Sequence, residues 1–427
     1  MQYFGLAHVF GAWVSQTDAG EAYANLRQRN HFATLTSIGL VAMTGWLAQL
    51  GIGARVPWWA TSMALLLALG NAASGSRTGL LQWLLVPILA AWWALAVPGG
   101  RRGVLVFVLK PVLAYATAFV ALPWLLMATS GIISGGLLGR FAETPGCASR
   151  LVLWSNVLTL IVEKPWFGWG WGELSYAHFI TDYPGVRFCE ILDNAHNLPL
   201  HLAVMLGIPA AFTLCAGLGW LVLRARPWRE TDPARQMAWG VLAVIMLHSM
   251  LEYPLWYGPF QMALGLCVWL LWRSPAKQED HLNENPKKRL GVSAGVAAVL
   301  MATTAYVAWD YHRISQIYLA PQARDAAYRD DTMNKVRRTW LFRNQVRFAE
   351  LTTTPLTQDN AQWTFDTAAA LLHFSPEPRV IEKVIESAAM LGREDEALAH
   401  FARYRAAFPQ DHESWAKAGR PDDGQMR

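Results

Sequence analysis

The sequence has few charged residues for its length. Of its 427 residues, 16% are charged and 53% are hydrophobic, so a water-facing surface cannot cover the whole chain. This balance excludes an ordinary soluble globular protein and indicates a membrane protein. The net charge of +5 is then expected to reflect loop arginines that set the topology, and nucleic-acid binding is not expected.

Signals for secretion and for metal binding are also missing. Residues 1–32 include Asp18, Glu21, Arg27 and Arg29, with no apolar run ahead of a small-residue cleavage site, so no cleavable signal peptide is visible. The acidic residues of 131–197 form no D-x-D pattern, and no His/Cys spacing typical of a metal site occurs. We therefore expect neither a metal nor a cofactor.

Long apolar runs are what the sequence has in excess. A bilayer core about 30 Å thick requires roughly 20 apolar residues per helix. The chain supplies about eight such runs, at 33–52, 57–74, 78–98, 103–130, 198–223, 237–256, 258–272 and 290–308. The 22 tryptophans, including those of "WFGWGWG" at 166–172, suit the headgroup level. The fold class predicted is an all-α, polytopic membrane helix bundle.

Positive charges orient this bundle. Arg101 and Arg102, "RARPWRE" at 224–230 and the ends of 273–289 are expected to be cytoplasmic. The opposite side, the periplasm of a Gram-negative cell, then receives residues 1–32, the turns at 74–78 and 252–258, the loop 131–197 and the C-terminal tail. The predicted domains are a membrane domain over 1–310, with 131–197 as a large periplasmic loop, and a periplasmic α-helical domain over 311–427.

The four cysteines divide by this topology. Cys215 and Cys267 lie inside apolar helices and are expected to be small buried hydrophobes. Cys147 and Cys189 both lie in the outward loop, in an oxidising compartment, and are candidates for a disulfide.

Several arginines lie on the same outward side. Arg77, between two apolar runs in "SGSRTG" (74–79), is either an interface anchor or an anion ligand, because a guanidinium binds phosphate through two parallel hydrogen bonds. Arg27, Arg29, Arg140 and Arg150 can supply further cations, although each taken singly fits a solvated surface.

The stretch "DNAHN" at 193–197 precedes an apolar helix. Asp193 or Asn194 can cap that helix, which would hold His196 on a rigid element. His196 is then either part of a helix cap or a general base that works near neutral pH.

A second polar group occurs in "HSMLEYPLWY" at 248–257. His248 and Glu252 are four residues apart, which places them on one helical face as either a structural hydrogen-bonded pair or support for a site. Tyr253 borders the same outward surface, either as an interface aromatic or as a functional residue.

In order, "RQRNHFAT" (27–34), "SGSRTGLL" (74–81), a large outward loop, "DNAHN" and a return turn with "EYPLW" resemble the bacterial O-antigen ligase superfamily. The resemblance is greatest to the protein O-oligosaccharyltransferases, or pilin glycosylation ligases, and covers roughly residues 20–310. In that family, further membrane helices usually precede the motif that contains Gln28. These helices are expected to be missing from this chain.

The resemblance implies a function. Family members transfer a glycan from undecaprenyl-pyrophosphate, without a metal, to serine or threonine of an exported protein such as pilin, at the periplasmic face of the inner membrane. His196, Gln28 and Tyr253 match the family's catalytic residues, and Arg77 and Arg150 match arginines that hold the pyrophosphate. Arg140 and Arg27 are further donor-binding candidates, and Asn194, Asn197, Glu252 and His248 are expected to support the site.

Alternatives stay open. Within the superfamily they are an O-antigen ligase, with a lipid A core acceptor, and an O-antigen polymerase. A transporter or flippase would show internal repeats and polar residues near the membrane midplane, and a membrane scaffold would need neither His196 nor Arg77. In the tail, "LGREDEALAHFARYRAAFP" (391–409) fits either one tetratricopeptide repeat or a plain amphipathic helix pair. Its position suggests a surface for acceptor proteins or for self-association.

Overall fold

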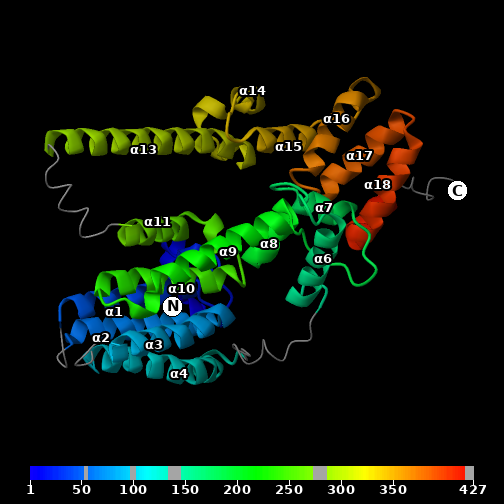
Figure 1. Cartoon of the computed structure of the whole chain (residues 1–427). Helices are drawn as coiled ribbons and strands as arrows, with labels where there is room; N and C mark the ends of the chain where they lie inside the picture. Colours follow the sequence, from blue (N-terminus) through cyan, green and yellow to red (C-terminus); the bar gives the residue numbers. More distant parts are fainter. Residues whose placement is uncertain (52–55, 97–101, 133–145, 273–285, 419–427) are drawn as a thin grey trace. The chain divides into compact units, whose positions relative to one another are not determined.

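The computed structural model describes residues 1–51, 56–96, 102–132, 146–272 and 286–418 (Figure 1). Every regular element within these ranges is a helix. The all-α class predicted from the sequence is therefore confirmed, and the long apolar helices agree with a membrane protein. The chain divides into two compact units, which are described separately below.

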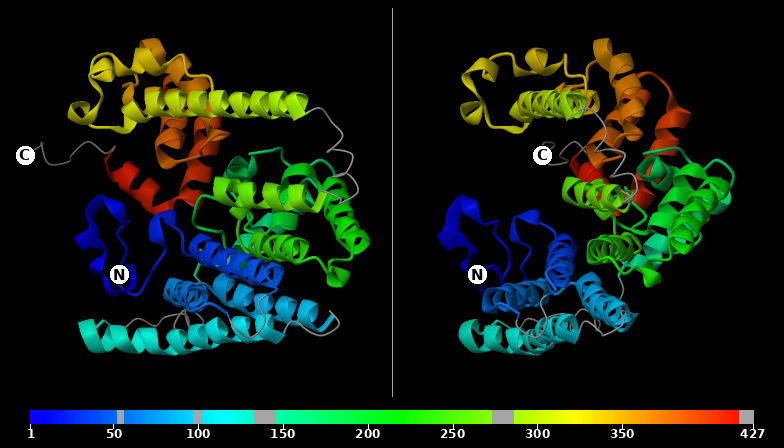
Figure 2. Two further views of the ribbon diagram at one scale, coloured as in Figure 1. Left: turned by 90° about the vertical axis from the view of Figure 1, so that its left-hand side faces the viewer. Right: turned by 60° about the vertical axis from the view of Figure 1, so that its left-hand side comes forward.

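Unit 1 consists of Met1–Pro145, His196–His201 and Ala211–Lys277. Its regular elements are η1 (Gln2–Phe4), η2 (Leu6–Trp13), η3 (Ala24–Leu26), α1 (Arg29–Gln49), α2 (Trp58–Ser74), α3 (Arg77–Ala96), α4 (Arg102–Ser130), η4 (Pro227–Arg229), α10 (Pro233–Ser249), η5 (Pro254–Trp256) and α11 (Gly258–Trp272). Helices α1 to α4 and α10 lie side by side (Figures 1 and 2).

The core of unit 1 is apolar and joins all of these helices. Leu40 of α1, Trp83 of α3, Phe107 of α4 and Ile245 of α10 are buried in one cluster. On α2 the inward face is made of alanines at i, i+4 and i+8, beginning at Ala60, and these small residues let α1 and α4 pack closely against α2.

Four helices in the described ranges are long and apolar enough to cross a bilayer: Arg29–Gln49, Arg77–Leu95, Gly103–Ser130 and Ile208–Arg229. A shorter apolar helix covers Gly258–Trp272. Most ends of these helices lie within a few residues of the ends of the apolar runs predicted from the sequence. The total of about eight spans and the orientation of the bundle stay predictions.

The predicted run at 198–223 is two helices rather than one. Helix α8 (Leu198–Leu206) ends before Gly207, which has φ +85°, and α9 begins after it (Ile208–Ala225). A Cβ atom at Gly207 would lie 2.2 Å from the carbonyl oxygen of Trp166, so only glycine fits this approach. The break comes from this close contact, which an apolar run does not reveal.

Unit 2 consists of Gly146–Ala195, Leu202–Ala210 and Gln278–Arg427. Its helices are α6 (Arg150–Glu163), α7 (Leu174–Ile180), α13 (Pro286–Ser315), η6 (Gln316–Tyr318), η7 (Pro321–Ala323), η8 (Ala326–Tyr328), α14 (Thr332–Val336), α15 (Arg343–Thr353), η9 (Gln358–Asn360), α16 (Ala361–Leu372), α17 (Pro378–Met390), α18 (Glu394–Ala407) and α19 (Pro409–Ala418). This division groups α13 and 146–195 with the C-terminal residues.

The C-terminal helices of unit 2 pack in sequence order. Helix α17 contacts both α16 and α18, and its buried Val380, Ile381, Val384 and Ile385 form one face of their shared core. Phe179 of α7 joins the same core. Helices α17 and α18 thus form a packed pair, which is compatible with both sequence alternatives, a tetratricopeptide repeat and a plain amphipathic helix pair.

Candidate functional site

Polar side chains of unit 1 gather where α1 and α3 begin and where α2 and α10 end. Local sequence sets these helix ends. The Gln28 amide oxygen accepts a hydrogen bond from His31 N (2.6 Å) and so caps α1. Helix α2 ends at Ser74 and is followed by Gly75, whose φ of +57° suits glycine. The buried Ser76 accepts from Gly79 N (2.9 Å) at the start of α3.

His196 and Glu252 form an ion pair or hydrogen-bonded pair at this end. His196 Nδ1 lies 2.8 Å from Glu252 Oε2, and their side chains are only 16% and 10% exposed. When Nδ1 carries the proton and donates it to the carboxylate, Nε2 is left as the basic nitrogen of the ring. The His196 backbone has φ +50°, an uncommon conformation for a residue with a side chain. Such strained positions often occur at functional sites.

Asn30 and Ser76 hold Glu252 from the other side. The Asn30 amide nitrogen donates to Glu252 Oε1 (3.3 Å), and the Ser76 hydroxyl donates to Asn30 Oδ1 (2.6 Å). These bonds connect the carboxylate to the first turns of α1 and α3. Arg77 follows Ser76 directly and its side chain is exposed, so an arginine lies one residue from this hydrogen-bonded chain.

A second polar layer lies deeper between the helices. His248 Nδ1 is hydrogen-bonded to Thr34 Oγ1 (2.8 Å), and the Gln82 amide nitrogen donates to the same threonine (2.8 Å). Asn71 of α2 donates to the carbonyl of Ala33 (2.8 Å). At Gly79 a Cβ atom would meet Asn71 Oδ1 at 2.5 Å, so glycine allows α1, α2 and α3 to converge here. This layer ties the helices that carry the site.

His248 and Glu252 lie around the C-terminal end of α10, where Glu252 N donates to the His248 carbonyl (2.9 Å) and both side chains also have partners on other segments. Helix α10 ends at Ser249, before the predicted limit of 256, and Pro254 starts η5. His248 therefore remains on the helix and binds Thr34, whereas Glu252 lies in the turn beyond it and binds His196 and Asn30.

Aromatic rings surround the imidazole. The Tyr253 ring packs edge-on against His196, with centroids 4.8 Å apart, and stacks with Tyr257 at 6.0 Å. Tyr257 in turn contacts His31 at 4.0 Å. The predicted catalytic tyrosine therefore lies directly beside the predicted base.

Other predicted residues occupy varied positions. Asn197 donates to the Met250 carbonyl (3.0 Å) and accepts from Leu200 N (3.1 Å), so it caps α8 and attaches it to the return turn. Arg27 is exposed, with φ +54°. In unit 2, Arg150 begins α6 and Asn194 is buried. Arg140 lies outside the described residues.

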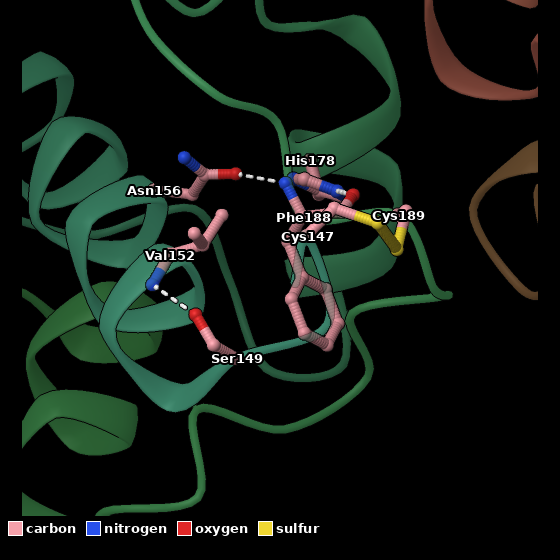
Figure 3. Close-up of a disulfide and its surroundings, with 7 residues drawn as sticks. All are labelled: Cys147, Ser149, Val152, Asn156, His178, Phe188 and Cys189. Carbon is pink, nitrogen blue, oxygen red and sulfur yellow. Dashed lines mark hydrogen bonds between the residues drawn. A yellow bond between two sulfur atoms is a disulfide. The ribbon is translucent and has the colours of Figure 1, made fainter. Parts of the chain in front are cut away.

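The predicted disulfide between Cys147 and Cys189 is present in unit 2, with Cα atoms 5.5 Å apart (Figure 3). Next to it, Asn156 Oδ1 accepts from Phe188 N (2.7 Å), and His178 is hydrogen-bonded to the Phe188 carbonyl (3.1 Å). Burial, together with the nearby Arg187 guanidinium, lowers the pKa of His178 to about 3, so the ring is neutral near pH 7.

The sequence did not single out Asn30, Ser76, Thr34 or Gln82. Asn30 and Thr34 lie inside "RQRNHFAT" and Ser76 inside "SGSRTG", so their positions next to the predicted residues were the available signal. Among the described residues, no group of three or more His, Cys, Asp or Glu is placed to hold a metal ion.

Comparisons with known proteins cover most of the chain. The O-antigen ligase model matches residues 62–215, the protein glycosylation ligase model matches 22–48, and a model described as virulence factor membrane-bound polymerase, C-terminal, matches 236–422.

The general O-oligosaccharyltransferase of Acinetobacter baylyi is 25% identical over 260 residues, which are 58% of this chain and 43% of that protein. The chain therefore spans less than half of the length of this relative. No solved structure matches the chain. By these matches the chain is similar to the O-antigen ligases and, within that superfamily, to the protein glycosylation ligases.

Proposed function

We propose that this chain transfers an oligosaccharide from undecaprenyl-pyrophosphate to serine or threonine hydroxyls of exported proteins such as pilin. The reaction takes place at the periplasmic face of the bacterial inner membrane and uses no metal. The relative's name, general O-oligosaccharyltransferase, supports a glycan transfer of this class. The polar end of unit 1, where α1 begins and α10 ends, is then the periplasmic end, as the placement of cytoplasmic arginines predicts.

The observation that carries this proposal is the His196–Glu252 pair. Glycosyl transfer to a hydroxyl requires a base. The hydroxyl proton passes to His196 Nε2, the acceptor oxygen bonds to the anomeric carbon, and the bond from that carbon to the pyrophosphate oxygen breaks. Glu252, which receives Nδ1–H, stabilises the imidazolium that forms and keeps Nε2 directed at the acceptor. Tyr253, edge-on to the ring, restricts its rotation.

Arginines are proposed to stabilise the leaving pyrophosphate, which departs with the electron pair. Arg77 is the leading candidate, because it stands beside Ser76 in the hydrogen-bonded chain that reaches Glu252. A guanidinium binds phosphate oxygens in a bidentate manner and can replace a metal cation in this role. Arg27, Arg140 and Arg150 remain donor-binding candidates from the family resemblance.

One comparison favours a second class of acceptor, the hydroxyl of a sugar. The family model matching 236–422 is described as a membrane-bound polymerase. The same base and arginines would serve a sugar hydroxyl, whether of a lipid A core or of a growing O-antigen. The chemistry at the anomeric carbon is identical, so the acceptor alone distinguishes these activities.

The test is transfer in a reconstituted system. The chain in proteoliposomes is supplied with a labelled undecaprenyl-pyrophosphate glycan and, separately, with pilin, lipid A core or a second glycan donor. Label on pilin serine or threonine supports the proposal, whereas label only on lipid A core or in longer glycans assigns the alternative. Label that crosses the membrane without covalent transfer would indicate a flippase and contradict both.

A further inference from the structure

Unit 2 exposes several large apolar side chains between residues 151 and 171. Its members are Leu151, Leu158 and Val162 of α6 and Trp166, Phe167 and Trp171 of the following loop. Their exposed fractions run from 51% at Leu158 to 89% at Phe167. Soluble surfaces rarely gather this many large apolar groups within some twenty residues, and such patches mark a binding surface.

On α6 the exposed residues form one narrow stripe. Leu151, Leu158 and Val162 are spaced i, i+7 and i+11, which places them on the same line along a helix. The opposite face, with Leu153, Val157 and Leu160, is buried in the protein. Helix α6 therefore carries large apolar side chains on the side that faces outward as well as on the side that packs.

The loop after α6 is held in place by its backbone. Trp169 N donates to the Val204 carbonyl (2.9 Å), Gly170 N to the Met205 carbonyl (3.0 Å), and Ile208 N to the Pro165 carbonyl (2.8 Å). Side chains at Gly168 or Gly207 would collide with the facing backbone, at 2.4 Å and 2.2 Å. The exposed aromatics are thus carried on a fixed loop, not on a free one.

The attachment point sets the depth of this loop. Ile208 is the first residue of α9, which belongs to a candidate membrane span. At about 1.5 Å per residue, the helix from Ile208 to Ala225 covers about 27 Å, close to the roughly 30 Å of a bilayer core. Ile208 therefore lies near the boundary between headgroups and acyl chains, and the Pro165 carbonyl bonded to it lies at the same level.

We infer that α6 and the loop 165–171 lie in the headgroup layer of the outer leaflet, with their apolar side chains inserted at the acyl boundary. Tryptophan and phenylalanine next to an apolar helical stripe are the side chains that partition to this layer. The occupant of the surface is the phospholipid bilayer. This anchor fixes the height of the segment that follows it, and the inference does not depend on the proposed glycan transfer.

The inference can be tested by site-directed spin labelling of the full chain. Cys215 and Cys267, the free cysteines in the described ranges, are replaced by alanine, which leaves the disulfide intact. Nitroxides are then attached to single Phe167→Cys and Leu158→Cys variants in nanodiscs of phosphatidylethanolamine and phosphatidylglycerol. Both sites are exposed, so the label displaces no packed side chain.

Two reference sites calibrate the measurement. Phe212→Cys lies one turn into α9 and reports the acyl region. Leu398→Cys lies at an exposed position of α18 and is the control matched to Leu158→Cys. We expect the oxygen-to-nickel collision ratio at positions 167 and 158 to exceed that at 398 and to approach that at 212.

Collision ratios at 167 and 158 equal to the ratio at 398 would overturn the inference. So would labels that are water-accessible in the nanodisc and become immobilised only when the lipid-linked glycan or the acceptor protein is added, because the surface would then bind substrate.

Discussion

Glu252 and His196 are 56 positions apart in the sequence, yet the Glu252 carboxylate oxygen lies 2.8 Å from the His196 Nδ1. The other carboxylate oxygen receives a hydrogen bond from Asn30, 222 positions away. Three segments therefore meet at one carboxylate. This arrangement gives the imidazole a fixed orientation and leads to the predictions below.

Replacing the proposed base should abolish most turnover. For His196→Ala we expect a fall in glycan transfer of roughly 10²–10⁴-fold, the usual contribution of a general base. Binding of the lipid-linked donor should stay nearly unchanged, since the proposed role of the ring is toward the acceptor hydroxyl. Transfer and donor binding are measured separately in proteoliposomes, with and without EDTA. Wild-type transfer by the variant, or loss of wild-type activity in EDTA, would contradict the mechanism.

Neutralising the partner of His196 should lower turnover. In Glu252→Gln the amide can still accept a hydrogen bond from Nδ1–H but cannot stabilise an imidazolium by charge. We expect glycan transfer to fall while binding of the lipid-linked donor stays nearly unchanged. Glu230→Gln, which alters a carboxylate before the opposite end of α10, is the matched control and should keep the wild-type turnover. Wild-type turnover in Glu252→Gln would reduce Glu252 to a structural role.

Arg77 variants should affect the donor rather than the base. We expect Arg77→Ala to weaken donor binding as well as turnover, and Arg77→Lys to restore only part, because an ammonium lacks the bidentate geometry of a guanidinium. Arg224→Ala, an exposed arginine at the end of α9, provides the comparison. Equal donor affinity in Arg77→Ala and wild type would leave Arg77 as an interface anchor.

Removing the disulfide should destabilise unit 2. The bond joins residues 42 positions apart, and in the chain-entropy model a closed loop of this size contributes about 3–4 kcal/mol. Cys147→Ser and Cys189→Ser should therefore unfold at a lower temperature than the wild type, and Cys215→Ala should not. Mass measurement after alkylation without reduction checks the bond itself: two labelled thiols at 147 and 189 in the native chain would refute it.

Acid should destabilise unit 2 through His178. Its folded-state pKa is lowered to about 3 by burial, whereas an unfolded histidine titrates near 6.5. Between these values the unfolded state binds more protons, so stability falls as pH decreases from about 6.5 towards 3, by up to about 1.4 kcal/mol per pH unit. Thermal unfolding between pH 7.5 and pH 5 measures this. His178→Gln should show a smaller pH effect, and an equal one would assign it to other groups.

The sequence by itself determined where most of the helices lie. Predicted runs at 57–74 and 103–130 agree with α2 and α4 within one residue at each end, because a long apolar run in lipid has to satisfy its backbone hydrogen bonds internally. The shared loop made Cys147 and Cys189 candidates for a disulfide, and the structure contains that bond. His196, Arg77 and Tyr253 became candidates through their motifs alone.

Tertiary structure decided which polar groups meet. Spacing of four residues left open whether His248 and Glu252 form a structural pair or support a site. Because α10 ends at Ser249, the turn brings Glu252 to His196 and Asn30. The break at Gly207 likewise depends on the Trp166 carbonyl, more than thirty residues away in the chain. Helical periodicity is a local property, whereas a hydrogen bond between distant segments depends on how the helices pack and where each one ends.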